Sequence, residues 1–94
     1  MTQPAGEHLA SGNTYLAKKQ YNEAIIEYRV AVQKEPNLAR ARLNLARAYS
    51  SSGEFANAFP EYLRAGDLLP DDLDVQAEVG NALLLARRFE DAKA

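Results

Sequence analysis

GNTYLAKKQYNEAIIEYRVAVQKEP, residues 12–36, carries small and aromatic residues at fixed intervals and ends in a proline. These spaced residues are Gly12, Tyr15, Tyr21, Ala24, Tyr28, Ala31 and Pro36. The same kinds of residue return 34 positions later, at Ala46, Tyr49, Phe55, Ala58, Tyr62, Ala65 and Pro70. The pattern begins a third time with Gly80, Leu83, Phe89 and Ala92. A fixed period of this length is typical of a repeat array, in which each unit packs against its neighbours.

The composition narrows the classes of function. The chain has 94 residues, a net charge of −2 and no run of Lys and Arg, so no nucleic-acid partner is predicted. It has no cysteine, which excludes disulfides and thiolate metal sites and leaves cytoplasm and bacterial periplasm both open. Its longest apolar run, residues 82–86, is far shorter than the roughly 20 residues that cross a bilayer, so no membrane insertion is predicted.

Apolar residues at helical spacing predict helices over residues 5–18, 22–34, 38–51, 57–68 and 73–86, with a further helix starting at 89. Residues 1–4 are predicted to be a disordered lead-in. Asn22 is the predicted N-cap of the second helix, and Asp71 or Asp72 that of the fifth. Gly53 suits a left-handed residue after the third helix. Pro60 is placed in the first turn of the fourth helix, where a missing N–H costs little.

The 34-residue period, the helix–turn–helix plan and the small and aromatic positions together resemble the tetratricopeptide repeat (TPR). The two complete units are identical at Ala5/Ala39, Leu9/Leu43, Tyr15/Tyr49, Ala24/Ala58, Glu27/Glu61, Tyr28/Tyr62, Ala31/Ala65 and Pro36/Pro70. The chain departs from the family where TPR units usually begin with a large aromatic residue, since it has His8, Arg42 and Gln76 there.

This resemblance implies an all-α superhelix, a solenoid of antiparallel helix pairs. A first repeat would occupy residues 5–38 and a second residues 39–72. Residues 73–94 would form a partial third repeat, with one helix and the start of another. Gly12, Ala46 and Gly80 are expected to be small because the two helices of each unit approach closely there.

No residue pattern indicates catalysis, a metal or a cofactor. His8 is the sole histidine, and no nucleophile–base pair or phosphate-binding glycine loop is present. The aspartates at 67, 71, 72 and 74 lack the spacing of a calcium-binding loop. The sequence therefore predicts a protein that is not an enzyme.

In TPR-like arrays the first helices of successive units line a groove that holds a peptide or a partner helix. Helical spacing places Leu9, Asn13, Arg40, Leu43, Asn44, Arg47, Asp74, Glu78 and Asn81 on that groove. The alternative is a solvated surface on which Arg40 pairs with Asp74 and Arg47 with Glu78. Some TPR proteins clamp C-terminal carboxylates of heat-shock chaperones with Lys, Arg and Asn. Here Leu9, Asp74 and Glu78 replace the cations of that clamp, so a different ligand is expected.

The incomplete third unit predicts an exposed apolar edge that includes Val79, Leu83, Leu84 and Phe89. The first interpretation is therefore a scaffold that binds a protein or peptide through the groove. The alternative is an assembly module of a longer repeat array that forms homo-oligomers through this edge. The repeat units of this chain also look similar to those of bacterial export and polysaccharide-secretion systems, including lipoproteins.

Overall fold

The computed structural model describes residues 4–93, without the side chains of residues 89, 92 and 93. Its helices are α1 (Ala5–Ala17), α2 (Tyr21–Lys34), α3 (Ala39–Ser51), α4 (Phe55–Leu68) and α5 (Leu73–Lys93). No strand occurs among these residues, so the predicted all-α fold is confirmed. Most of the predicted lead-in, residues 1–3, lies outside the described residues. No helix in the described range has the length and apolar character needed to span a membrane.

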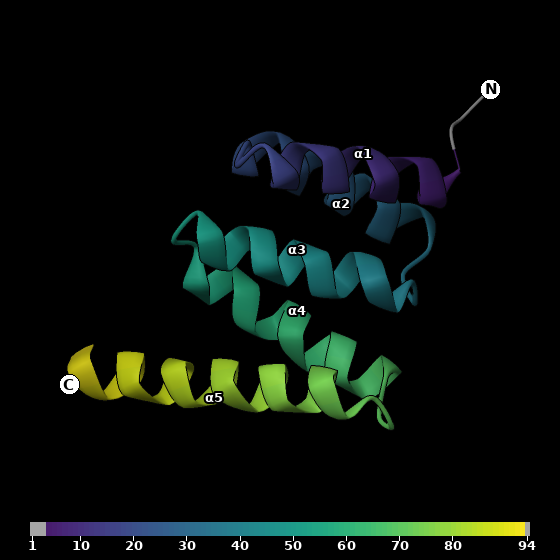
Figure 1. The fold of residues 1–94 in the computed structure, drawn as a ribbon. Coiled ribbons are helices and arrows are strands. Elements are labelled where there is room, and N and C mark those ends of the chain that lie inside the picture. The colour runs from purple at the N-terminus through teal and green to yellow at the C-terminus, as the bar shows by residue number, and fades with distance from the viewer. Residues whose placement is uncertain (1–3, 94) are drawn as a thin grey trace.

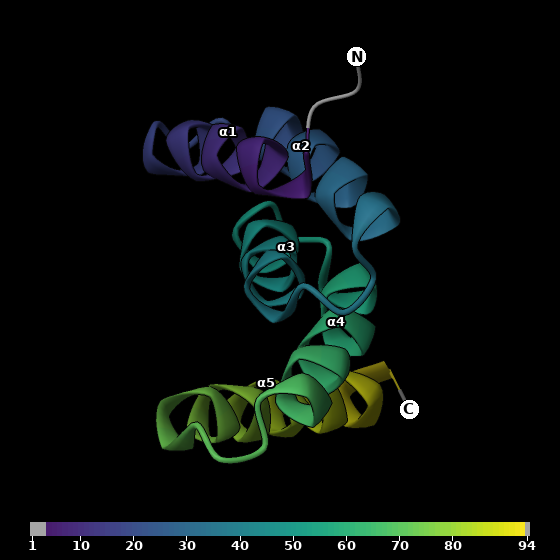
Figure 2. The same cartoon turned by 90° about the vertical axis from the view of Figure 1, so that its right-hand side faces the viewer.

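The helices form a stack in which each packs against the next along the chain. Figure 1 shows α1, α3 and α5 one below another, all lying in the same direction across the view. In Figure 2, turned by 90°, α2 and α4 lie on the same side of α3. The first helices of the units therefore form one layer and the second helices another, as expected of a helical repeat.

The core follows the repeated small and aromatic positions. Tyr28 and Leu43 are the largest fully buried side chains, and Ala24, Ala46 and Ala58 are also fully buried. One apolar cluster joins α2 to α3 and another joins α3 and α4 to α5. Tyr49 packs against both clusters, so the core is continuous from the first unit to the third.

Gly12 is where α1 and α2 approach most closely. A Cβ placed on Gly12 would lie 2.5 Å from Cε1 of Tyr28, so no larger residue fits there without a shift of the ring. The prediction for Gly12 is therefore confirmed. Gly80 is exposed, and a Cβ placed on it would meet nothing within 4 Å, so the same prediction is wrong for the third unit. No separate second helix packs on Gly80 within the described residues.

The turns and caps agree with the sequence in part. Gly53 adopts a positive φ of 85° and ends α3 as predicted. Asp72 caps α5, since its Oδ1 accepts a hydrogen bond from the Val75 N–H at 3.1 Å. Asn22 is not a cap, because α2 already begins at Tyr21 and has no side-chain cap.

Pro60 lies inside α4 rather than in its first turn, because this helix begins at Phe55, earlier than predicted. Proline has no N–H to donate to the carbonyl four residues earlier, which belongs to Ala56. Both Pro60 and Ala56 are exposed, so water can bond to that carbonyl and lower the cost.

The third unit differs from the prediction because α5 is one helix over Leu73–Lys93, without a break near Ala86. Arg87 stands 34 positions after Gly53 and 68 after Lys19, the two residues with left-handed backbone at the other turns. That conformation costs about 1–2 kcal/mol for a residue with a Cβ. A non-glycine residue adopts the left-handed conformation where packing of the following helix offsets this cost. At Arg87 the chain does not turn, and α5 continues as one helix.

We expect Gly12→Ala to lower the free energy of unfolding by roughly 1–3 kcal/mol, because the new methyl group overlaps the buried Tyr28 ring. Urea denaturation monitored by circular dichroism measures this change. Gly6→Ala is the matched control in the same helix, where a Cβ meets nothing within 4 Å. That variant should gain roughly 0.5–1 kcal/mol from helix propensity. Equal effects of the two variants would contradict the close approach at Gly12.

Candidate functional site

A chain of hydrogen-bonded side chains crosses the three first helices. The Tyr28 hydroxyl donates to Oδ1 of Asn13 at 2.6 Å, and Nδ2 of Asn44 donates to the same oxygen at 2.9 Å. The Arg47 guanidinium donates to Oδ1 of Asn44 at 3.2 Å. It also holds Glu78 on α5 through two bonds of 2.8 and 2.7 Å. We call these five residues the polar chain.

The polar chain runs from the buried Tyr28 on α2 to Glu78 beneath and along a surface that we call the first-helix face. It carries the predicted residues Asn13, Arg40, Asn44, Arg47, Asp74, Glu78 and Asn81. Arg40, Asn44 and Arg47 are spaced so that they share one side of α3, and Asp74, Glu78 and Asn81 do the same on α5. The predicted Arg47–Glu78 ion pair is present. No Arg40–Asp74 pair forms within the described part of the chain.

The Arg47–Glu78 pair also sets the charge of this face. Hydrogen bonds from Arg47 lower the pKa of Glu78, so its carboxylate stays charged at neutral pH. Bonding to Glu78 in turn raises the pKa of Arg47. The two side chains keep 40% and 30% of their surface exposed, which limits the pair to about 1 kcal/mol of stability. Its main effect is to cancel two charges on the face.

Three side chains on the first-helix face have free hydrogen-bond donors within residues 4–93, and Asp74 is an exposed acceptor without a partner in the same range. Arg40 and Asn81 are exposed and make no hydrogen bond or ion pair within residues 4–93. Asn13 uses its oxygen twice but leaves its exposed amide N–H groups free in the same range. Each of α1, α3 and α5 thus contributes one such group, whereas Asn44, Arg47 and Glu78 are bonded to one another.

Two of the predicted groove residues are less available. Leu43 has no exposed surface, because it belongs to the core between α3, α4 and α5. The structure therefore removes Leu43 from the groove. Leu9 is half-buried and packs against the clusters around Tyr28 and Ala31.

The predicted apolar edge is exposed only in part. Leu83 and Leu84 are 40% and 59% exposed, as expected, and the neighbouring Leu85 is 56% exposed. Val79 is only 7% exposed because it packs against α4 at Gly66, so its assignment to the edge is wrong. The Phe89 side chain lies outside the described residues.

A hollow of about 210 Å³ adjoins the polar chain between the end of α3, the start of α4 and α5. We call it the inner hollow. Its lining residues are Ser50, Phe55, Phe59, Tyr62, Glu78, Asn81, Ala82 and Leu85. Five of these eight are apolar or aromatic. The repeat pattern did not predict this hollow, although the replacement of Leu16 by Ser50 in the 34-residue register was visible.

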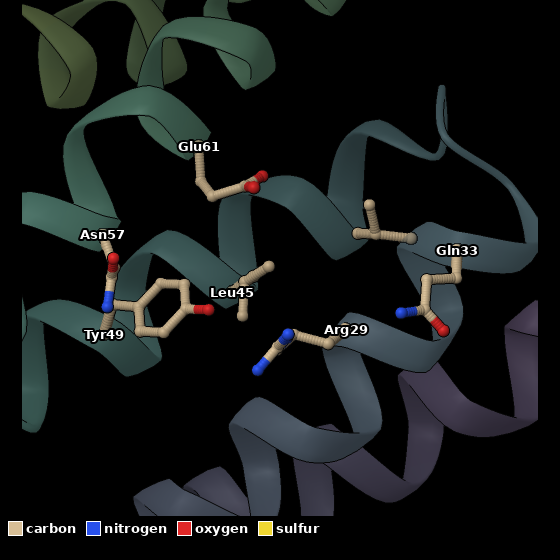
Figure 3. Close-up of a pocket in the computed structure, with 7 residues that line it drawn as sticks. Arg29, Gln33, Leu45, Tyr49, Asn57 and Glu61 are labelled. Atoms are coloured by element: carbon tan, nitrogen blue, oxygen red, sulfur yellow. The ribbon is translucent and has the colours of Figure 1, made fainter.

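A second hollow, of about 390 Å³, lies between α2 and α4 with α3 as its floor. Figure 3 shows Arg29 and Gln33 on α2, Leu45 and Tyr49 on α3, and Asn57 and Glu61 on α4. Burial raises the pKa of Tyr49 at this floor, and the positive charge of Arg29 partly opposes the increase. We call it the outer hollow. Its walls belong to the second helices α2 and α4, so it is separate from the first-helix face.

Comparisons with known proteins agree with this architecture. Residues 12–53 match a family model described as TPR repeat, and residues 39–71 match one described as tetratricopeptide repeat. The chain belongs to the tetratricopeptide repeat family. TPR repeats generally mediate protein–protein interactions and are typically non-enzymatic. No group of three or more metal-binding side chains occurs in the part of this TPR chain that the structure describes.

One similar TPR protein is the small glutamine-rich tetratricopeptide repeat-containing protein 2 of Mycosarcoma maydis. The two are 29% identical over 83 residues, which is 88% of this chain. The matched region is 24% of the relative's length, so the comparison concerns the repeats and not the whole relative.

The departures from the usual TPR pattern now have a structural explanation. His8 bonds to Glu27 at 2.8 Å, and Arg42 bonds to both oxygens of Glu61 at 3.1 and 3.0 Å. The two pairs are related by the 34-residue period and join the first helix of each unit to the second. Gln76, at the third position, donates instead to the carbonyls of residues 66 and 69. Polar contacts thus replace aromatic packing at these sites.

We expect the stability of this TPR domain to fall as the pH rises from about 10 to about 12, partly because of Tyr28. Burial raises the pKa of Tyr28 to about 12, against about 10 in an unfolded chain. The folded state therefore favours the neutral phenol. This contribution is complete below pH 10 and disappears as the pH approaches 12. Urea denaturation of wild type and Tyr28→Phe between pH 7 and 11.5 measures it.

Tyr28→Phe should cost roughly 0.5–1.5 kcal/mol at pH 7 through the lost bond to Asn13. Above pH 10 its stability should decline less than that of the wild type. Tyr49 and Tyr62, whose pKa values burial also raises, are present in both proteins and account for the shared part of the decline. Identical alkaline declines would show that Tyr28 is not the group responsible.

Proposed function

We propose that this TPR domain binds a segment of a partner protein across its first-helix face. The observation that carries the proposal is the placement of Asn13, Arg40 and Asn81. Each lies on a different first helix and has hydrogen-bonding groups that no residue among 4–93 satisfies. An Asn amide pairs with a backbone N–H or C=O, and an Arg guanidinium with a carboxylate. Such groups suit an extended polypeptide that lies on this face.

The polar chain supports this proposal because its hydrogen bonds link the three first helices to one another. Asn44 is 7% exposed and bonds to both Asn13 and Arg47, so α1 and α3 are held by a buried contact. The bidentate pair with Glu78 adds α5. A rigid arrangement of donors lowers the ordering cost of binding. The bonded groups therefore support the face, and its contacts are Arg40, Asn81 and the free amide N–H groups of Asn13.

Arg40→Glu should weaken binding of peptides selected on this domain from a random display library by roughly fivefold to tenfold, about 1–1.4 kcal/mol. Fluorescence anisotropy measures the affinity of each selected peptide. Arg29→Glu is the matched control, since it makes the same charge change at an exposed arginine on the outer surface. Arg29→Glu should leave affinity within twofold of the wild type. Equal losses in both variants would indicate a general charge effect and would contradict the proposed face.

The exposed leucines of α5 favour a second candidate function, assembly. Leu83, Leu84 and Leu85 are consecutive, so helical geometry spreads them over more than one side of α5. Adjacent large apolar side chains that stay exposed often mark contact sites. In this alternative the domain serves as an assembly module, and the end of the helix stack makes the contacts rather than the first-helix face.

If assembly through this end occurs, Leu84→Glu should convert oligomers to monomers in analytical ultracentrifugation at about 100 µM protein. Ile26→Glu is the control, because Ile26 is similarly exposed, at 62%, but lies on α2. Ile26→Glu should leave the sedimentation of the protein unchanged. A wild-type protein that is already monomeric at this concentration would rule the assembly alternative out.

A further inference from the structure

The inner hollow lies at an interface whose packing residues differ from their counterparts in the 34-residue register, at Leu16/Ser50, Ile25/Phe59 and Ser51/Leu85. Leu16 and Ser50 are equivalent in the 34-residue register. At the first interface Leu16 packs against the cluster formed by Ala24, Ile25, Tyr28, Leu45 and Ala48. At the second interface Ser50 contributes only a hydroxymethyl group, and a space of about 210 Å³ remains. The hollow is therefore a feature of this sequence and not of the repeat itself.

The size and walls of the hollow fit an aromatic ring. An engineered cavity of roughly 150 Å³ with aliphatic and aromatic walls binds benzene in another protein. The inner hollow is larger and is lined by the rings of Phe55, Phe59 and Tyr62. Aromatic rings prefer edge-to-face or offset contacts with one another, which three surrounding rings can provide.

Charge favours a neutral group inside the hollow. Glu78, the carboxylate among its described lining residues, is already held by two bonds from Arg47, so it does not require a cationic partner. Asn81 is exposed and adds a free amide to the lining. An uncharged ring that carries a polar atom, such as a phenol or an indole, matches both the apolar walls and this amide.

Arg40 places a second requirement on the same ligand. It is an exposed cation on the first-helix face without an ion-pair partner in the described residues, and Asp74 is not within ion-pair distance. Arg40 and Ser50 are ten residues apart on α3, or about 15 Å at 1.5 Å per residue. An extended peptide covers that distance in four or five residues at about 3.3 Å each.

We propose that the partner segment inserts an aromatic side chain into the inner hollow and presents a carboxylate to Arg40 from a residue four or five positions away. This inference rests on the proposed binding function and specifies the chemistry of the partner. The hollow acts as the anchor that selects the segment. Arg40 then fixes its direction and register along α3.

The decisive variant is Ser50→Leu, which restores at the second interface the residue found at the first. It should fill the hollow, raise the melting temperature and weaken aromatic peptides at least about tenfold. Because the variant is expected to be more stable than the wild type, lost binding cannot be attributed to unfolding. Gln33→Leu is the control, since Gln33 is exposed on α2 and lines the outer hollow rather than the inner one. It should change affinity less than twofold.

Two measurements separate this inference from the proposed function. Library peptides selected on the wild type should be enriched in an aromatic residue with Asp or Glu four or five positions away. Selection on Arg40→Glu should lose the acidic preference and keep the aromatic one. If peptides bind the first-helix face without an aromatic preference, or bind Ser50→Leu equally well, the inner hollow is not the anchor although the proposed function stands.

Indole titrated into the ¹⁵N-labelled domain tests the hollow without any peptide. The amide signals of Glu78, Asn81 and Leu85 should shift in the wild type and in Gln33→Leu, but not in Ser50→Leu. Leu85→Glu offers a second variant, because it introduces a charge at a lining residue that is 56% exposed. It should also abolish the shifts, whereas Leu84→Glu, outside the lining, should not. Shifts that persist in Ser50→Leu would overturn the proposal.

Discussion

The close contact between Gly12 and Tyr28 connects the packing of the fold to its candidate binding face. Because Gly12 has no side chain, the Tyr28 ring lies directly against α1 and is fully buried. This position brings its hydroxyl to Asn13, at 2.6 Å. From Asn13 the hydrogen bonds continue through Asn44 and Arg47 to α5. A steric requirement of the core therefore determines how the polar residues of α1, α3 and α5 are presented. A change at Gly12 would disturb the first-helix face as well as the stability of the fold.

The sequence predicted the parts of the structure that repetition determines. Two nearly equivalent units at a spacing of 34 residues specify the helix pairs, the buried alanines and the left-handed Gly53, because each of these depends on local sequence and on contacts that recur. The pairing of side chains between units was harder to predict from the sequence. The ion pair between Arg47 and Glu78 was predicted from the register. The hydrogen bond from Asn44 to Asn13, however, depends on how α1 is rotated about its axis relative to α3. Periodicity alone does not supply that rotation.

The continuous α5 shows where the register fails as a guide. A turn at Arg87 would be stabilised only by packing of a following helix, and no separate second helix occurs in the third unit within the described residues. Nothing in the segment 86–90 is a glycine or proline, so the local sequence favours continuation. The same absence of a packing partner explains why Gly80 is exposed although Gly12 is buried. A repeat position specifies the structure when its unit packs both on the preceding unit and on its own second helix. In the described residues, the third unit has only the first of these contacts.

Differences between the repeats, rather than the repeats themselves, carry the information about ligands. Leucine in place of Ser50 would bury about two or three more carbon atoms, each worth about 0.8 kcal/mol, and the equivalent Leu16 shows that the scaffold accepts it. Ser50 therefore lacks the apolar burial that Leu16 provides at the equivalent position. Such a local deficit is expected where a protein uses the space for binding, since stability and function commonly conflict at binding sites. The deficit borders Glu78, the last residue of the polar chain, so the vacant space and the ordered polar residues lie side by side on one face.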